Sequence, residues 1–239
     1  MAQIGVTLGI ARHQAGNSAL PPTTPALVGS VAPAGITPEL RREVLKRDDH
    51  ACQCCGFRSE KYQEILHINQ DTRDTRLDNL ATTCQFCHQC FAVDKVAQMR
   101  SGVLIWLPEL TQTELNHLSR ALYVARISQG PMADTSRKIL DMLMTRREDV
   151  RRRLGTDDVF VLATVLRDYV GQRHYAERHQ KLDGVRLFPL DRRIIKEADL
   201  EFNQFPQILA YWRSKDGPFG GKVPTAWIDM YRETFRQVG

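Results

Sequence analysis

The chain has 239 residues, which is enough for one large or two small domains with a substantial core. Its composition is ordinary for a globular protein, and its longest apolar run, residues 159–166, is far too short to span a membrane. The net charge of +5 is compatible with nucleic acid or an anionic membrane surface, but the excess is small and acidic residues are interspersed. Charge alone therefore selects no partner.

Residues 1–35 are predicted to form a flexible N-terminal arm or linker. This region has no acidic residue and a single arginine, and its prolines stand among small residues. Near its start, IGVTLGIARHQ can make one short strand. The region lacks the basic start and the long apolar core of a secretory signal, so we do not expect export by that route.

A helix is predicted to begin directly after Thr37, which is a good N-cap. Pro38 suits the first helical position, and Glu39 lies in the first turn, where the backbone amides favour negative charge. An apolar stripe then follows at helical spacing, formed by Leu40, Val44 and Leu45.

The six cysteines all lie between residues 52 and 90, and four of them form two C-x2-C pairs: Cys52 with Cys55, and Cys84 with Cys87. Such pairs occur on tight turns, where two thiolates converge on one tetrahedral ion and a second pair completes the shell. Gly56 fits the first turn because glycine tolerates left-handed dihedral angles. The sequence therefore predicts one structural metal site with four protein ligands, closed to substrate.

Other uses of these cysteines are less consistent with the pattern. Two disulfides would need an oxidising compartment, and a redox C-x-x-C would need only one pair. Zinc is the expected ion, although four thiolates also suit iron. Cys54 and Cys90 remain outside the set, and we expect them to be small buried apolar residues.

The spacer between the cysteine pairs is long enough to have structure of its own. Residues 62–69 alternate and are predicted to form a strand, and residues 77–80 then lead into the second pair. A second helix is expected from about residue 87 to residue 99.

The order of these features resembles the HNH endonuclease module, a ββα-metal fold. The features are a helix, C-x2-C-G, a strand bearing a histidine, then D-N-L and C-x2-C-H. In that family the strand histidine is a general base, the asparagine orients it, and the last histidine joins a preceding Asp or His in holding a catalytic divalent ion. The resemblance assigns these roles to His67, Asn79 and His88.

The sequence departs from the HNH pattern at Leu66, where the family needs a carboxylate or an imidazole. Leucine cannot bind a metal, so His88 is left as a lone ligand unless Asp71 or Asp74 folds back. The alternative is that His67 packs on the strand and bonds a carbonyl, while His88 caps a helix or faces solvent. We favour this alternative, in which the scaffold is kept without the chemistry.

The string VLIWLPELTQTELNHLSRALY predicts a strand, a turn and a helix. Thr111 as the N-cap and Glu114 three residues later form a capping box. Apolar residues at helical spacing then predict a core-facing stripe: Leu115, Leu118, Leu122 and Ala125.

With RDDHACQCCGF, RLDNLATTCQFCHQCF and LIWLPELTQTELNHL, the chain closely resembles the IcmJ/DotN family of type IVB (Dot/Icm-type) secretion and related conjugation systems, over about residues 38–190. The resemblance implies a small cytoplasmic protein, held peripherally at the inner membrane through the coupling complex. It also implies binding to the DotL-like coupling ATPase and an HNH-like fold without established cleavage chemistry.

After residue 126 the sequence predicts mainly helices. The arginines at 146, 147 and 151–153 are compatible with phosphate binding. No aromatic residues are interleaved with them for stacking on bases, so we favour a solvated face. On that face we expect i,i+4 ion pairs of Glu148 with Arg152 and of Asp149 with Arg153.

Residues 134 or 135 can cap one helix, which Gly155 can end, and further helices are expected at 156–171 and 172–182. Residues 186–190 are expected to be extended before a helix that opens at Asp191.

The stretch from residue 200 to residue 239 is rich in aromatic residues, which is not typical of a disordered tail. These residues either complete the core or make a groove for a partner, and we expect core completion, with Trp212 and Trp227 as the residues to test for docking. Residues 216–224, DGPFGGKVP, are predicted to be a loop between two helices.

The sequence therefore predicts an α+β protein with three parts: the arm at 1–35, an HNH-like four-cysteine module at 36–110, and a helical region at 111–239. Two functions remain open. In one, the protein is a non-catalytic adaptor of a coupling complex, with no membrane insertion and no nucleic acid partner. In the other, it is a metal-dependent DNA endonuclease with His67 as general base.

Overall fold

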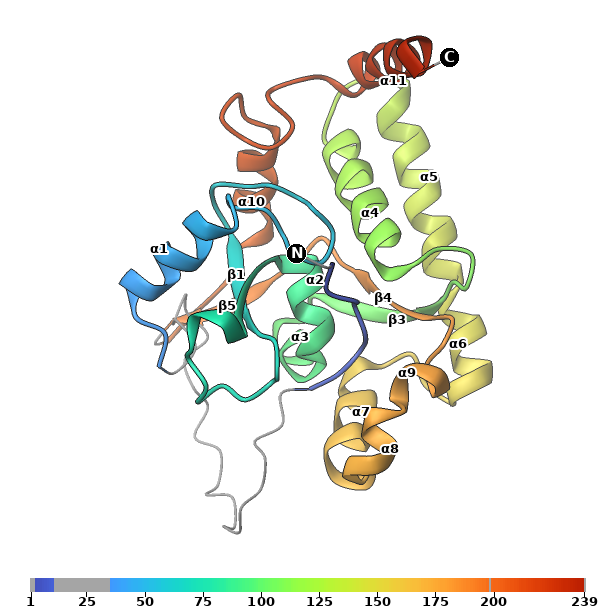
Figure 1. Ribbon diagram of the computed structural model, residues 1–239. Helices are drawn as coiled ribbons and strands as arrows, with labels where there is room; N and C mark the ends of the chain where they lie inside the picture. Colours follow the sequence, from blue (N-terminus) through green and yellow to red (C-terminus); the bar gives the residue numbers. More distant parts are fainter. Residues whose placement is uncertain (1–2, 11–34, 198, 239) are drawn as a thin grey trace.

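The computed structural model describes residues 3–10, 35–197 and 199–238 (Figure 1). Within these residues it contains three antiparallel sheets of two strands each, and helices dominate the chain after residue 111. A mixed α+β architecture with a largely helical C-terminal region is thereby confirmed.

The first helix begins where the sequence predicts it. The Thr37 hydroxyl accepts a hydrogen bond from the Leu40 amide at 3.2 Å, which caps α1 (Pro38–Arg47). The helix packs its Val44 against the hairpin formed by β1 (Gln63–His67) and β2 (Leu80–Cys84). This hairpin places the second cysteine pair at the end of β2.

The single helix expected at 87–99 is wrong. The chain instead forms three short pieces: α2 (Gln85–His88), a 3-10 turn η2 (Gln89–Phe91) and α3 (Val93–Met99). The break occurs because the Val93 amide donates to the Gly9 carbonyl at 3.0 Å instead of to the preceding turn, and Ala92 leaves helical geometry.

The N-terminal segment 3–10 causes this break and packs into the protein. Its Gly9 amide donates to the Cys90 carbonyl at 2.8 Å, and Ile4 donates to the Gln53 carbonyl at 3.0 Å. Leu8 and Ile10 are buried. No strand is assigned in this extended segment, and the rest of the predicted arm, at 11–34, lies outside the described residues.

The second sheet joins distant parts of the chain. Strand β3 (Gly102–Trp106) pairs with β4 (Val185–Pro189) in the register Leu104 with Leu187. Between them, α4 (Gln112–Arg126) begins with the predicted Thr111–Glu114 capping box, which is confirmed. The division of the chain at residue 110 stays a prediction, and the β3–β4 pairing crosses it.

After α4, helix α5 begins earlier than expected and α7 begins later, and the helices break more often than predicted. Pro131 lies in the first turn of α5, and Gly130 is the N-cap in place of Asp134 or Thr135. Gly155 ends α6 with φ of 75°, as expected. The elements are α5 (Pro131–Thr145), α6 (Arg147–Leu154), α7 (Val159–Thr164), the π-helical turn η3 (Val165–Tyr169), α8 (Gln172–Ala176) and α9 (Arg178–Lys181).

The arginines of α6 form ion pairs, but the predicted i,i+4 partners are wrong. Arg151 pairs with Glu148, and Arg152 with Asp149, each at i,i+3. The Asp157 carboxylate, just beyond the helix, accepts from Arg147 and Arg151. Arg153 instead lies over the ring of Trp106, 3.9 Å from its centroid. These contacts with carboxylates and an aromatic ring support a solvated, internally paired face.

The helix predicted to open at Asp191 is also wrong, because the chain forms a hairpin there. Strands β5 (Ile194–Glu197) and β6 (Leu200–Asn203) pair with each other, and Ile195 is buried. The Asn203 side chain accepts from the amides of Arg193 and Phe205 at 2.8 and 3.1 Å. The side chain of Asn203 thus closes the hairpin and stabilises the start of the following helix.

Two of the C-terminal aromatic residues, Phe205 and Trp212, are buried and complete the core as expected, whereas Trp227 is partly buried and Tyr231 is 63% exposed. Helix α10 (Phe205–Arg213) buries Phe205 and Trp212 against Phe57 and Phe86 of the cysteine region. The predicted loop at 216–224 leads to α11 (Pro224–Val238) at the upper end of the molecule (Figure 1). None of the helices in the described ranges has the length and apolar character needed to cross a bilayer.

We predict that Tyr175→Phe frees the N-terminal segment. The buried Tyr175 hydroxyl accepts from the Ile10 amide and donates to the Ile10 carbonyl, each at 2.8 Å. Its loss leaves two backbone groups unpaired and should cost about 1–3 kcal/mol. Hydrogen exchange and proteolysis of residues 3–10 should accelerate. The exposed Tyr169→Phe is the control, and equal exchange in both variants would contradict the prediction.

Candidate metal centre

One turn, the end of a strand and the start of a helix bring four cysteine sulfurs together. Cys52 and Cys55 lie in the turn after α1, Cys84 ends β2, and Cys87 lies in α2. All four side chains are buried, and their Sγ atoms lie within 4.8 Å of one another. The Cys55 and Cys84 sulfurs are 3.7 Å apart, which matches the separation of about 3.8 Å expected for two sulfurs in a tetrahedron with Zn–S bonds of about 2.3 Å. These four sulfurs are therefore placed to hold one metal ion.

Local backbone geometry explains the convergence. In the first turn the Gly56 amide donates to the Cys52 carbonyl at 2.8 Å, and Gly56 has φ of 74°, which favours glycine. In the second, the Cys84 sulfur caps α2 by accepting from the Cys87 amide at 3.5 Å. Both turns fold because of hydrogen bonds within a few residues, so the C-x2-C spacing itself is enough to predict them.

The surroundings of three of the four sulfurs favour thiolates, the form that binds metals, whereas hydrogen bonding with the neighbouring cysteines raises the pKa of the fourth, Cys87. Hydrogen bonding with Cys54 lowers the pKa of Cys52 to about 4. Burial by itself raises the pKa of Cys84, but hydrogen bonding with Cys52 and the positive charge of Arg120 bring it to about 7.

One face of α4 covers the sulfur cluster, and sequence reasoning did not identify it. Arg120 is 1% exposed, and its Nη2 donates to the sulfurs of Cys84 at 2.9 Å and Cys55 at 3.3 Å. Asn116 Nδ2 donates to the Cys87 sulfur at 3.3 Å. The sequence does contain a signal for these contacts. Asn116 and Arg120 are polar residues four positions apart, and they lie among the leucines that were predicted to face the core.

The two remaining cysteines are buried, as expected, and neither belongs to the four-sulfur cluster. The Cys90 sulfur donates to the Phe86 carbonyl at 3.2 Å. Cys54 lies in the first turn beside the ligand candidates.

The asparagine of the HNH-like pattern holds a loop. Asn79 Nδ2 donates to the Asn69 side chain at 2.9 Å and to the Asp74 carbonyl at 2.8 Å, while its Oδ1 accepts from the Asn69 amide at 3.0 Å. Through these bonds the side-chain amide of Asn79 closes the loop that connects β1 and β2. Among the described residues no hydrogen bond joins the Asn79 side chain to His67.

The two histidines lie in different surroundings from those expected. His67 is buried at the end of β1, and its Nε2 has no hydrogen-bond partner in the described part of the chain. His88 is half-buried, and burial lowers its pKa to about 4, so that it stays neutral at physiological pH. Leu66 packs in the main core. Among the residues described, the four cysteines form the only group of three or more metal-binding side chains that lie close together.

No family model matches this chain. Over 162 residues, however, it is 32% identical to the type 4 apparatus protein DotN of Legionella pneumophila (strain Philadelphia 1), covering 66% of this chain and 75% of that relative. The chain belongs to the DotN (IcmJ) family. The family predicted from the cysteine-containing strings and LPELTQTELN is thereby confirmed.

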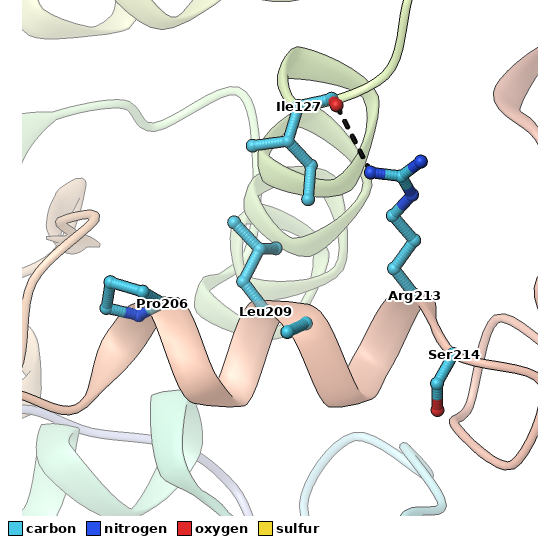
Figure 2. Close-up of a pocket in the computed structure, with 6 residues that line it drawn as sticks. Ile127, Pro206, Leu209, Arg213 and Ser214 are labelled. Carbon is cyan, nitrogen blue, oxygen red and sulfur yellow. Dashed lines mark hydrogen bonds between the residues drawn. The ribbon is translucent and has the colours of Figure 1, made fainter.

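The surface of this DotN-family chain has a shallow apolar hollow between the end of α4 and α10 (Figure 2). Its one charged lining residue, Arg213, donates to the Ile127 carbonyl at 3.4 Å and so caps the end of α4. The lining includes no carboxylate, histidine or cysteine. The residues that line it are Ile127, Pro206, Leu209, Ala210, Arg213 and Ser214.

We predict that Cys84→Ser abolishes metal binding and unfolds the cysteine region. A structural metal contributes folding free energy on the order of 10 kcal/mol, which is comparable to the total stability of a typical domain. Metal content by mass spectrometry and thermal unfolding are the measurements. Cys90→Ser, also buried but outside the cluster, should keep the metal and lose no more than about 2 kcal/mol. Equal metal content in the two variants would exclude the centre.

Proposed function

We propose that this protein is a non-catalytic adaptor of a type IVB secretion or conjugation coupling complex, and that it binds a segment of the DotL-like coupling ATPase. The relationship to the type 4 apparatus protein DotN carries this proposal. Partner proteins would hold it at the cytoplasmic face of the inner membrane. The basic residues of α6 are paired with carboxylates or packed on a ring, which does not favour nucleic acid as a partner.

In this proposal the four cysteines hold one structural zinc ion. Four thiolates at tetrahedral spacing suit zinc, and with every position filled by protein the ion has no open position for substrate or water. Iron has the same ligand preference, and metal analysis of the purified protein distinguishes the two.

We further propose that residues 36–110 form an HNH-like module that has lost its chemistry. The order of α1, a cysteine turn, the β1–β2 hairpin, a second cysteine turn and α2 supports the likeness. Leu66 in the core and the loop-bound amide of Asn79 argue against a second, catalytic metal ion beside His67.

The adaptor role predicts a stable complex with the coupling ATPase encoded in the same genome. The two proteins should co-purify after co-expression and migrate together in size-exclusion chromatography. Cys84→Ser should lose the complex because the fold is lost, whereas Cys90→Ser should keep it. Failure of the metal-loaded native protein to bind the ATPase would contradict the proposal.

The loss of chemistry predicts that purified protein does not cut DNA. Supercoiled and linear duplexes should stay intact with Mg²⁺, Mn²⁺, Zn²⁺ or Ni²⁺. His67→Ala should behave like the native protein in this assay. Divalent-dependent cleavage by the native protein that disappears in His67→Ala would establish the nuclease instead.

A further inference from the structure

A closed four-cysteine centre creates an electrostatic difficulty. A divalent ion with four thiolates has a net charge of −2, and all four cysteines here are buried. Burying an uncompensated charge is expensive, because the protein interior solvates it far less well than water. The fold therefore needs positive charge or hydrogen-bond donors directed at the sulfurs.

Arg120 supplies both. Its guanidinium is 1% exposed, and one nitrogen reaches the sulfurs of Cys84 and Cys55, at 2.9 and 3.3 Å. Arginine stays protonated, and although burial by itself lowers the pKa of Arg120, the nearby thiolates raise it above its usual value. In the described part of the chain this guanidinium forms hydrogen bonds with the two sulfurs and with His117, and no ion pair with a carboxylate.

The position of the guanidinium is fixed from several sides. Its Cζ lies 4.1 Å from the ring centroid of Phe57 and 5.5 Å from that of Phe86. Its Nη1 lies 3.2 Å from His117 Nδ1, and His117 Nε2 lies 2.8 Å from the Cys55 carbonyl. Since arginine can only donate, Nδ1 accepts and Nε2 carries the proton that is donated to that carbonyl.

A second donor on the same helix links the centre to the β3–β4 sheet. Asn116 donates to the Cys87 sulfur and accepts from Gln112 Nε2 at 3.0 Å. Gln112 also exchanges two hydrogen bonds with the backbone of Leu187 in β4, at 2.8 and 2.9 Å. Three of the four sulfurs thus accept a hydrogen bond from α4, which lies beyond the predicted end of the cysteine module.

We propose that Arg120 is a positioning residue of the metal centre, whose buried guanidinium offsets part of the negative charge of the metal–thiolate cluster, so that metal binding and the docking of α4 occur together. This inference rests on metal binding at the four cysteines. It extends that site to a helix whose side chains bind no metal.

The proposed coupling extends to the C-terminal region through aromatic contacts. Phe57 and Phe86, which border the guanidinium, meet the ring of Trp212 at centroid distances of 5.7 and 5.5 Å in edge-to-face geometry. Trp212 is 2% exposed. Its fluorescence should therefore respond to the removal of metal.

The test compares Arg120→Met and Arg120→Lys with Arg126→Met as the matched control. Arg126 is on the same helix but pairs with Asp191 at 3.0 Å, and within the described residues it forms no hydrogen bond with a cysteine. Zinc affinity is measured by competition with a chromophoric chelator. The sulfur-to-cobalt charge-transfer band of the Co²⁺-substituted protein reports the charge at the sulfurs, which a purely space-filling side chain would not change.

Arg120→Met should weaken zinc binding by about 10- to 100-fold and move the cobalt band to longer wavelength, because the sulfurs lose a cation and its hydrogen bonds. Arg120→Lys, which keeps the charge, should fall between Arg120→Met and the native protein. Arg126→Met should match the native protein in both measurements.

Zinc affinity and a cobalt band unchanged in Arg120→Met would overturn the role of Arg120 while leaving the metal centre intact. If Arg120→Met does not fold, the inference is judged on Arg120→Gln, which removes the charge but keeps a hydrogen-bond donor, and native zinc affinity with an unshifted cobalt band in that variant would overturn it. Native protein that binds neither zinc nor cobalt would instead overturn the proposed metal centre itself.

Discussion

The convergence of four buried sulfurs is the constraint on which the rest of the structure depends. Four sulfurs at this spacing cannot all be thiolates in a core without a cation, because buried like charges repel one another. Around them the chain places two tight turns, a hairpin and the face of α4. The cysteine region is thus embedded in the larger core, and its stability and that of the helices are linked through common residues.

Long-range contacts around the centre join segments that are far apart in sequence. The N-terminal segment bonds the backbone at Cys90 and Val93, just after the second cysteine turn. Helix α10 lays Phe205 and Trp212 on Phe86 from the other end of the chain. Loss of the fold around the sulfurs would therefore disturb the packing at both ends of the described chain.

The residues that resemble the HNH pattern have structural roles in this fold. Asn79 closes the loop between β1 and β2 with three hydrogen bonds, so it has a structural role whether or not water is activated nearby. His67 is buried at the end of its strand, and Leu66 contributes to the core. These structural roles do not depend on any chemistry at His67.

The sequence by itself determined the features that depend on nearby residues. Thr37 and Thr111 begin helices because their hydroxyls meet amides three residues away, and the C-x2-C turns close through bonds of similar range. The strings around these features also identified the family. Tertiary structure decided what depends on distant partners. Gly9 divides the helix expected at 87–99, Asn203 closes a hairpin where a helix was expected, and Arg120 reaches sulfurs 36 and 65 residues away along the chain. Sequence pattern alone does not reveal these contacts, because each depends on where the fold brings a second segment.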